Sequence, residues 1–188
     1  MKLPIALSNK HIHLSQADID VLFGEGYELT KFKPLSQPGQ YACEEKVTVV
    51  GPKGQQTMRV LGPARPESQV EVSLADARAL GIAVPVRQSG DVEGTPGFKL
   101  VGPKGEVDCE RGIIVAARHI HMSLEDAAKF GVEDKQIVKV RTFGPRAVVF
   151  ENVLVRANAA FALEMHVDVE EGNAAGVRNG EMVELIAE

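Results

Sequence analysis

The stretch SNKHIHLS at residues 8–15 returns as AARHIHMS at residues 116–123. A second pair of stretches matches in the same way, QVEVS at residues 69–73 and EMHVD at residues 164–168, and each is followed by residues that end in a glycine. Internal similarity of this kind marks a duplicated architecture. The sequence therefore predicts two related halves, each built from two similar segments.

All four segments carry the same signal for the start of a short helix. A residue that can accept a hydrogen bond from the backbone is followed three positions later by an acidic residue, at Ser15/Asp18, Ser73/Asp76, Ser123/Asp126 and Asp168/Glu171. This spacing is typical of a helix N-cap with an acid in the first turn. Glycines suited to the helix ends follow, at Gly24, Gly81, Gly131 and Gly176. We expect a strand, a cap and a short helix four times over.

The rest of the chain is rich in β-branched residues, often in alternation with polar ones, as in half-buried strands. We expect strands at residues 46–50, 56–61, 98–101, 112–116, 137–142 and 147–155, with hairpin turns at the two Gly-Pro-Lys-Gly motifs, residues 51–54 and 102–105. The predicted fold is mostly β: two small antiparallel β-barrels or sandwiches related by the duplication and capped by short α-helices.

The composition is that of an ordinary globular protein. The 188 residues are 44% apolar and 25% charged, and the formal net charge of -5 gives no basic field for a nucleic-acid partner. Cys43 and Cys109 are far apart and lack the spacing of a zinc knuckle. No apolar run approaches the ~20 residues that cross a bilayer. We expect a cytoplasmic protein with neither nucleic acid nor membrane as a partner.

The five histidines all fall in the repeated segments, at His11, His13, His119, His121 and His166, and Glu71 takes the matching position in the remaining segment. Residues i and i+2 of a strand point to the same face, so each His-x-His pair can converge on one ion. The predicted ligand sets are His11, His13 and Glu71 for one ion and His119, His121 and His166 for another. An exchange of ligands between the two halves is an alternative division.

Three protein ligands leave open positions on a divalent ion such as zinc, which is typical of catalytic sites. A single His-x-His pair is more often structural or a capping feature than metal-binding, but its duplication, with a third ligand in each half, favours metal. A metal-binding or sensor module with closed coordination is the alternative that is not an enzyme.

These residues, together with LGPAR at residues 61–65, resemble the PduL-type phosphotransacylases, also called phosphate propanoyltransferases, nearly end to end. The resemblance implies reversible transfer of a short acyl group, acetyl or propanoyl, between coenzyme A and inorganic phosphate at a dinuclear zinc centre, with one ion near the sulfur of coenzyme A. It also implies that Arg65 binds phosphate and is catalytic.

The resemblance further implies that the N-terminal strand joins the C-terminal half. The expected domains are residues 1–8 with 117–188, and residues 9–116 with an inserted loop or hairpin at about 23–43. We expect a homodimer, and residues 1–10 show no extension of the kind that targets some family members to microcompartments.

Other interpretations remain open at this point. A dinuclear zinc hydrolase, in which hydroxide replaces phosphate, could use the same ligands. Arg65 could make a surface ion pair, and Arg146 could be its counterpart in the second half. Cys43 and Cys109 lack an activating neighbour in sequence, so we expect them to be structural and phosphate to attack the thioester directly.

Overall fold

The computed structural model describes residues 1–186 and divides them into two compact units. One, which we call the barrel unit, consists of Met1–Asn9 and the chain from Ala117 onward. The other, which we call the open-sheet unit, is Lys10–Ala116. The chain therefore contributes its N-terminal strand to the same unit as its C-terminal strands.

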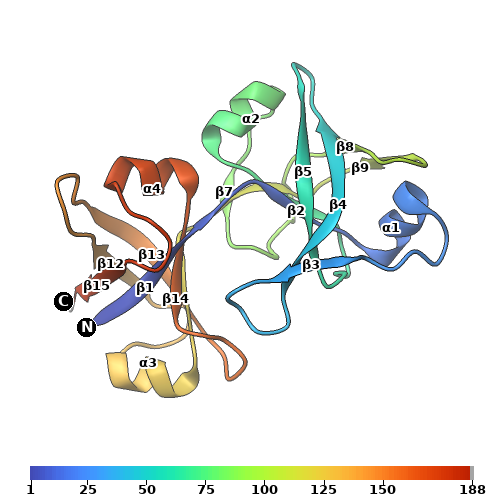
Figure 1. Ribbon diagram of the computed structural model, residues 1–188. Coiled ribbons are helices and arrows are strands. Elements are labelled where there is room, and N and C mark those ends of the chain that lie inside the picture. Colours follow the sequence, from blue (N-terminus) through green and yellow to red (C-terminus); the bar gives the residue numbers. More distant parts are fainter. Residues whose placement is uncertain (187–188) are drawn as a thin grey trace. The chain divides into compact units, whose positions relative to one another are not determined.

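The barrel unit is a closed six-stranded barrel whose N-terminal strand lies between two C-terminal ones. Figure 1 shows β1, the blue strand, running beside the red β15 and the orange β14. Around the barrel the order is β1 (Lys2–Ser8), β14 (Glu164–Asp168), β11 (His119–Met122), β13 (Val149–Ala157), β12 (Ile137–Arg141) and β15 (Met182–Ile186). Helices α3 (Leu124–Phe130) and α4 (Val169–Ala175) follow β11 and β14.

The open-sheet unit is a half-barrel sheet that does not close. Its path runs through β7 (Val86–Arg87), β10 (Ile113–Ala116), β6 (Gln69–Glu71), β2 (His11–His13), β5 (Gln55–Gly62), β4 (Tyr41–Val50), β8 (Phe98–Val101) and β9 (Glu106–Cys109), and β3 (Lys31–Pro34) pairs with β4. The edge strand β7 is only two residues long and both are exposed, so it offers few backbone groups for closure. Helices α1 (Gln16–Phe23) and α2 (Leu74–Leu80) follow β2 and β6.

The predicted fold class, mostly β with short helices, is confirmed, and so are the hairpins at the two Gly-Pro-Lys-Gly motifs. Gly51 N donates to Gly54 O at 2.8 Å, and Gly102 N donates to Gly105 O at 2.9 Å. The pairing is less uniformly antiparallel than expected. In each unit the His-x-His strand pairs in parallel with one neighbour, β2 with β5 and β11 with β13.

The four predicted helix caps are also confirmed. Ser15, Ser73, Ser123 and Asp168 each accept a hydrogen bond from the backbone N–H of the acidic residue three positions later. The helices end at Gly24, Gly81, Gly131 and Gly176. The last three of these glycines are left-handed, a conformation that glycine adopts without strain. None of the helices in residues 1–186 has the length and apolar character needed to cross a membrane.

Each unit has its own apolar core, and the central residue of each His-x-His motif belongs to it. Ile12 and Ile120 are completely buried. Ile12 packs with Val60 and Val70, whereas Ile120 packs with Val155 and Met165. Since side chains alternate along a strand, burial of the isoleucine turns both flanking histidines to the other face of the sheet. The core thus orients the candidate ligands.

Candidate metal centres

The same strand register assembles a group of candidate ligands in each unit. In the open-sheet unit the antiparallel pair β2/β6 places His11 opposite Glu71 and His13 opposite Gln69. In the barrel unit β11/β14 places His119 opposite His166 and His121 opposite Glu164. The duplication seen in the sequence is therefore a structural one, down to the residue.

The first trio, His11, His13 and Glu71, lies within the open-sheet unit. Its candidate ligand atoms all lie within 4.8 Å of one another. The rings of the two histidines are 5.0 Å apart and perpendicular, and His11 Nε2 lies 3.5 Å from Glu71 Oε2. Two nitrogen donors and one carboxylate at this spacing could hold a divalent ion.

The second trio, His119, His121 and His166, lies within the barrel unit, with its ligand atoms also within 4.8 Å of one another. The three ring centroids are separated by 4.6 to 5.0 Å. Nδ1 of His119 lies 2.9 Å from the Ala117 carbonyl, which favours a proton on Nδ1 and leaves Nε2 for an ion. Within residues 1–186 each candidate trio lies within one unit, and their assignment as metal ligands stays a prediction.

The second histidine of each His-x-His motif, His13 or His121, is held neutral by its surroundings. Burial, with smaller effects from His11 and from the charge of Arg65, lowers the pKa of His13 to about 3. Burial, followed by the effects of His119 and His166, lowers the pKa of His121 to about 2. Neutral imidazoles keep the lone pair that a metal ion requires.

Three buried imidazole nitrogens lack a hydrogen-bond partner: Nδ1 of His13, Nδ1 of His121 and Nε2 of His166. His166 Nε2 lies 3.1 Å from Glu164 Oε2, but the two atoms are not oriented to form a hydrogen bond. Leaving a buried polar atom unpaired costs about 1–3 kcal/mol. An ion in the first trio would satisfy His13 Nδ1, and a second ion in the other trio would satisfy His121 Nδ1 and His166 Nε2. The residues therefore fit the two metal ions that the sequence predicts.

Arg65 lies on the loop that joins β5 to β6, the strand that carries Glu71. Its backbone N–H donates to Leu14 O at 2.9 Å, which ties the loop to the end of β2. Its Nη1 donates to Ser89 Oγ at 3.3 Å. The charge of Arg65 contributes to the lowered pKa of His13, so the guanidinium is electrostatically coupled to the first trio.

Sequence reasoning missed two residues that lie beside the trios, Gln69 and Glu164. Gln69 Nε2 donates to Glu71 Oε1 at 2.7 Å, and the Glu164 carboxylate lies next to His166. Each precedes a predicted ligand by two positions on the same strand face. The period of two that linked the histidines would have found them. The two sites then hold one carboxylate each, Glu71 in one and Glu164 in the other.

Two further residues near the trios carried a weaker signal in the sequence. Ser89 lies in the segment that follows β7 and accepts hydrogen bonds from Arg65 and Gln69. No local sequence pattern predicts these two contacts. Arg156 pairs with His121 across β11/β13, and its charge contributes to the lowered pKa of that histidine. An arginine after the apolar run of residues 153–155 was the available sign in the sequence.

The other residues considered from the sequence, Arg146, Cys43 and Cys109, have environments that suit structural roles. Arg146 Nε donates to the Ala174 carbonyl at 3.0 Å, near the C-terminal end of α4. Cationic side chains are favourable there because helix carbonyls lack partners. Burial raises the pKa of the Cys43 thiol to about 11 and that of Cys109 to about 12, so neither is an activated nucleophile.

Comparison with known proteins gives consistent results. A family model described as phosphate propanoyltransferase matches residues 4–178. The chain is 54% identical over 184 residues to a phosphate propanoyltransferase of Thermotoga maritima, which covers 97% of this chain and 88% of the relative. The relative of the same name in Clostridioides difficile is 49% identical over 185 residues, 98% of this chain and 88% of the relative. The phosphate propanoyltransferase of Enterococcus faecalis is 52% identical over 177 residues, which cover 94% of this chain and 84% of the relative.

Proposed function

The chain belongs to the phosphate propanoyltransferase family, and from this premise we propose that it is a metal-dependent phosphate acyltransferase. Acyl-CoA and inorganic phosphate react to give acyl phosphate and free coenzyme A, and the reaction is reversible. A phosphate oxygen forms a bond to the acyl carbon while the carbon–sulfur bond breaks, so that sulfur leaves as thiolate. The family name supports propanoyl as the acyl group, and we include acetyl in the proposal.

The observation that carries the metal dependence is the pair of trios with unpaired buried nitrogens. We propose one zinc ion in each trio, held by His11, His13 and Glu71 and by His119, His121 and His166, because nitrogen donors with a carboxylate suit zinc. When bound, zinc stabilises the negative charge that develops on the thioester oxygen and on the departing sulfur. The protein contributes neutral, preoriented imidazoles to this arrangement.

Arg65 is the proposed phosphate ligand. A guanidinium offers two parallel N–H groups to two phosphate oxygens and stays charged at physiological pH. The loop contacts of Arg65 to Leu14 and Ser89 restrict where the guanidinium can be. Placing phosphate before the reaction removes much of the entropic cost of bringing two substrates together.

The raised thiol pKa values of Cys43 and Cys109 support direct attack by phosphate without an acyl-enzyme on cysteine. The dinuclear zinc hydrolase is the alternative that the family membership does not favour. A homodimer in the cytoplasm remains a prediction from the sequence, which light scattering and fractionation of cells would test.

The decisive experiment measures propanoyl-CoA consumption with and without phosphate, before and after chelation, and identifies the product. We expect phosphate-dependent formation of acyl phosphate that chelation abolishes and added zinc restores. Free acid formed in the absence of phosphate would instead identify a hydrolase. Turnover that resists chelation, with metal content confirmed to be nil, would refute metal dependence.

Metal content supplies a second test that does not depend on activity. Glu71→Gln and His166→Ala should each reduce the bound zinc from about two ions per chain to about one, because each removes one of only three protein ligands of an ion. The matched control is Glu106→Gln in the exposed β8/β9 hairpin, which should keep both ions. Full metal content in Glu71→Gln would contradict the assignment of the first trio.

A further inference from the structure

The Arg65 loop, residues 63–68 between β5 and β6, is held on one side by the residues that follow β2. Ser15 N donates to Ser68 Oγ at 2.9 Å, the Ser68 hydroxyl donates to Asp18, and Arg65 N donates to Leu14 O. These contacts fix the backbone of the loop. None of these three hydrogen bonds involves the Arg65 guanidinium, which contacts a second segment of the chain.

That second segment is residues 88–95, which we call the Ser89 segment. Ser89 Oγ accepts from Arg65 Nη1 at 3.3 Å and from Gln69 Nε2 at 3.0 Å, while Gly90 N donates to Gln69 Oε1 at 2.7 Å. Through Gln69 the same segment also reaches Glu71. The position of the Ser89 segment therefore bears on both the proposed phosphate ligand and a proposed metal ligand.

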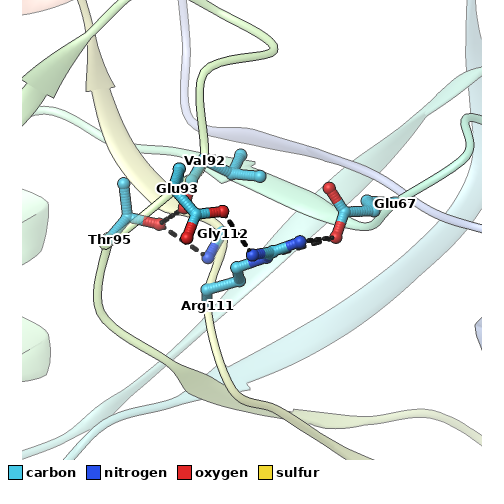
Figure 2. A network of polar contacts seen from close by, with 6 residues as sticks. All are labelled: Glu67, Val92, Glu93, Thr95, Arg111 and Gly112. Carbon is cyan, nitrogen blue, oxygen red and sulfur yellow. Dashed lines mark hydrogen bonds and ion pairs between the residues drawn. The ribbon is translucent and has the colours of Figure 1, made fainter.

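Arg111 connects the Arg65 loop to the Ser89 segment. Its Nε and Nη2 donate to Glu67 Oε1 at 3.2 and 2.7 Å, and its Nη1 donates to Glu93 Oε2 at 2.6 Å. Figure 2 shows the Arg111 guanidinium between the carboxylates of Glu67 and Glu93. Glu67 belongs to the Arg65 loop and Glu93 to the Ser89 segment. One side chain thus bridges the two pieces of chain that meet at the Arg65 guanidinium.

The backbone beneath Arg111 is itself held firmly. Gly112 N donates to Thr95 Oγ1 at 2.9 Å, and Thr95 Oγ1 donates to Val92 O at 2.7 Å, as Figure 2 also shows. Gly112 has φ 117°, and a Cβ there would lie 2.6 Å from Ser68 O. A residue other than glycine would be strained at this point, so the turn next to Arg111 requires Gly112.

These ion pairs contribute little to global stability. The side chains of Arg111, Glu67 and Glu93 are 43%, 54% and 84% exposed, and exposed pairs are screened by water and salt. Their effect should be local, restricting two segments relative to each other. We propose that Arg111 is a positioning residue that clamps the Arg65 loop to the Ser89 segment and so orients Arg65 for phosphate, an inference that rests on the proposed function.

The test compares steady-state kinetics of Arg111→Gln, Arg111→Lys and Ser89→Ala with wild type. Arg111→Gln should raise KM for phosphate roughly threefold to tenfold, as expected for loss of two exposed ion pairs, and leave KM for propanoyl-CoA unchanged. Arg111→Lys should restore part of the loss because it keeps the charge without the planar fork. The effects of Arg111→Gln and Ser89→Ala should be less than additive, because both act on the same contact.

Lys99→Gln is the matched control, because Lys99 and its partner Glu106 are 39% and 55% exposed in the same unit. It should leave both KM values at the wild-type level. If Arg111→Gln fails to fold, Glu93→Gln removes only the link to the Ser89 segment, from a side chain that is largely exposed. It should raise KM for phosphate more than about twofold, by less than Arg111→Gln because one ion pair is lost and not two.

Arg65→Ala separates this inference from the proposed function. If Arg65→Ala raises KM for phosphate whereas Arg111→Gln and Glu93→Gln stay within twofold of wild type, the clamp is refuted and the proposed function stands. If Arg65→Ala has no effect on phosphate, the phosphate role of Arg65 fails and the clamp fails with it. An equal rise in both KM values for Arg111→Gln would show a general structural defect and would also overturn the inference.

Discussion

Ile120 lies between two candidate ligands, His119 and His121, and is the best position to measure how strongly the barrel core supports the second trio. Ile120 is fully buried, whereas Ile137 in the same barrel is 56% exposed. The perturbation is the same truncation at both positions, Ile120→Ala and Ile137→Ala. Any difference between the two variants then reports burial and not side-chain chemistry.

The expected cost follows from the carbons removed. Isoleucine to alanine deletes three carbons, worth about 2.4 kcal/mol of transfer free energy at about 0.8 kcal/mol each. The cavity left in a closed barrel adds to this, giving about 3–4 kcal/mol for Ile120→Ala. For Ile137→Ala we expect a loss of less than about 0.5 kcal/mol.

The assay is urea unfolding of the metal-free proteins, followed by far-ultraviolet circular dichroism, with the midpoint and slope fitted for each variant. Zinc titration of the same proteins gives a second measurement. Because an ion that binds only the folded protein is linked to its stability, Ile120→Ala should also bind zinc more weakly. A loss below about 1 kcal/mol for Ile120→Ala, or an equal loss in Ile137→Ala, would refute the view that this isoleucine holds the histidine pair in place.

The remaining predictions concern thiols, acid stability and helix caps. Cys43 and Cys109 should react with a thiol reagent only slowly in native protein at pH 8 and fully after unfolding, because burial raises both pKa values; rapid native labelling would contradict this. Burial acts to raise the pKa of Asp76, but the Lys10 ammonium and Ser73 outweigh it and lower the pKa. The stabilisation is therefore present above the unfolded pKa of about 4 and is lost as pH falls through the lower folded value. Asp76→Asn should lower the free energy of unfolding at pH 7 and match wild type at the acid end of a series of urea unfolding curves at different pH. A stability difference between variant and wild type that grows as the pH falls would contradict the lowered pKa of Asp76. Ser123→Ala, which removes the cap of α3, should cost about 0.5–2 kcal/mol in the same unfolding assay, and no change there would contradict the cap.

Much of the candidate site could be predicted from the sequence because its determinants are local. A ligand pair two residues apart on a strand shares a face whatever the strand pairs with, so HIH at residues 11–13 and 119–121 was sufficient to propose ligands. The four caps involve residues three positions apart and required no tertiary information. The duplication then indicated that Glu71 and His166 occupy equivalent positions, as the strand registers show.

Sequence patterns did not identify the residues that surround the ligands. Ser89 meets Arg65 across a separation of 24 residues, and Arg111 meets Glu67 across 44. These contacts depend on where two irregular segments run over the surface. Hydrophobic periodicity carries no information about that path, because the side chains involved are polar and exposed.

The amino-acid sequence by itself determined the four duplicated strand–cap–helix segments, the longer alternating strands and the residue types of both trios, but it did not identify the short or edge strands β3, β7, β9 and β15. The family resemblance implied that the N-terminal strand joins the C-terminal half, but only the tertiary structure decided which strands pair there, β1 with β14 and β15. The parallel pairing of β2 with β5 and the second sheet that stays open also came only from the tertiary structure. The physical reason is that alternation specifies which side chains leave water, whereas the choice of neighbour is made by backbone hydrogen bonds that every strand can offer equally.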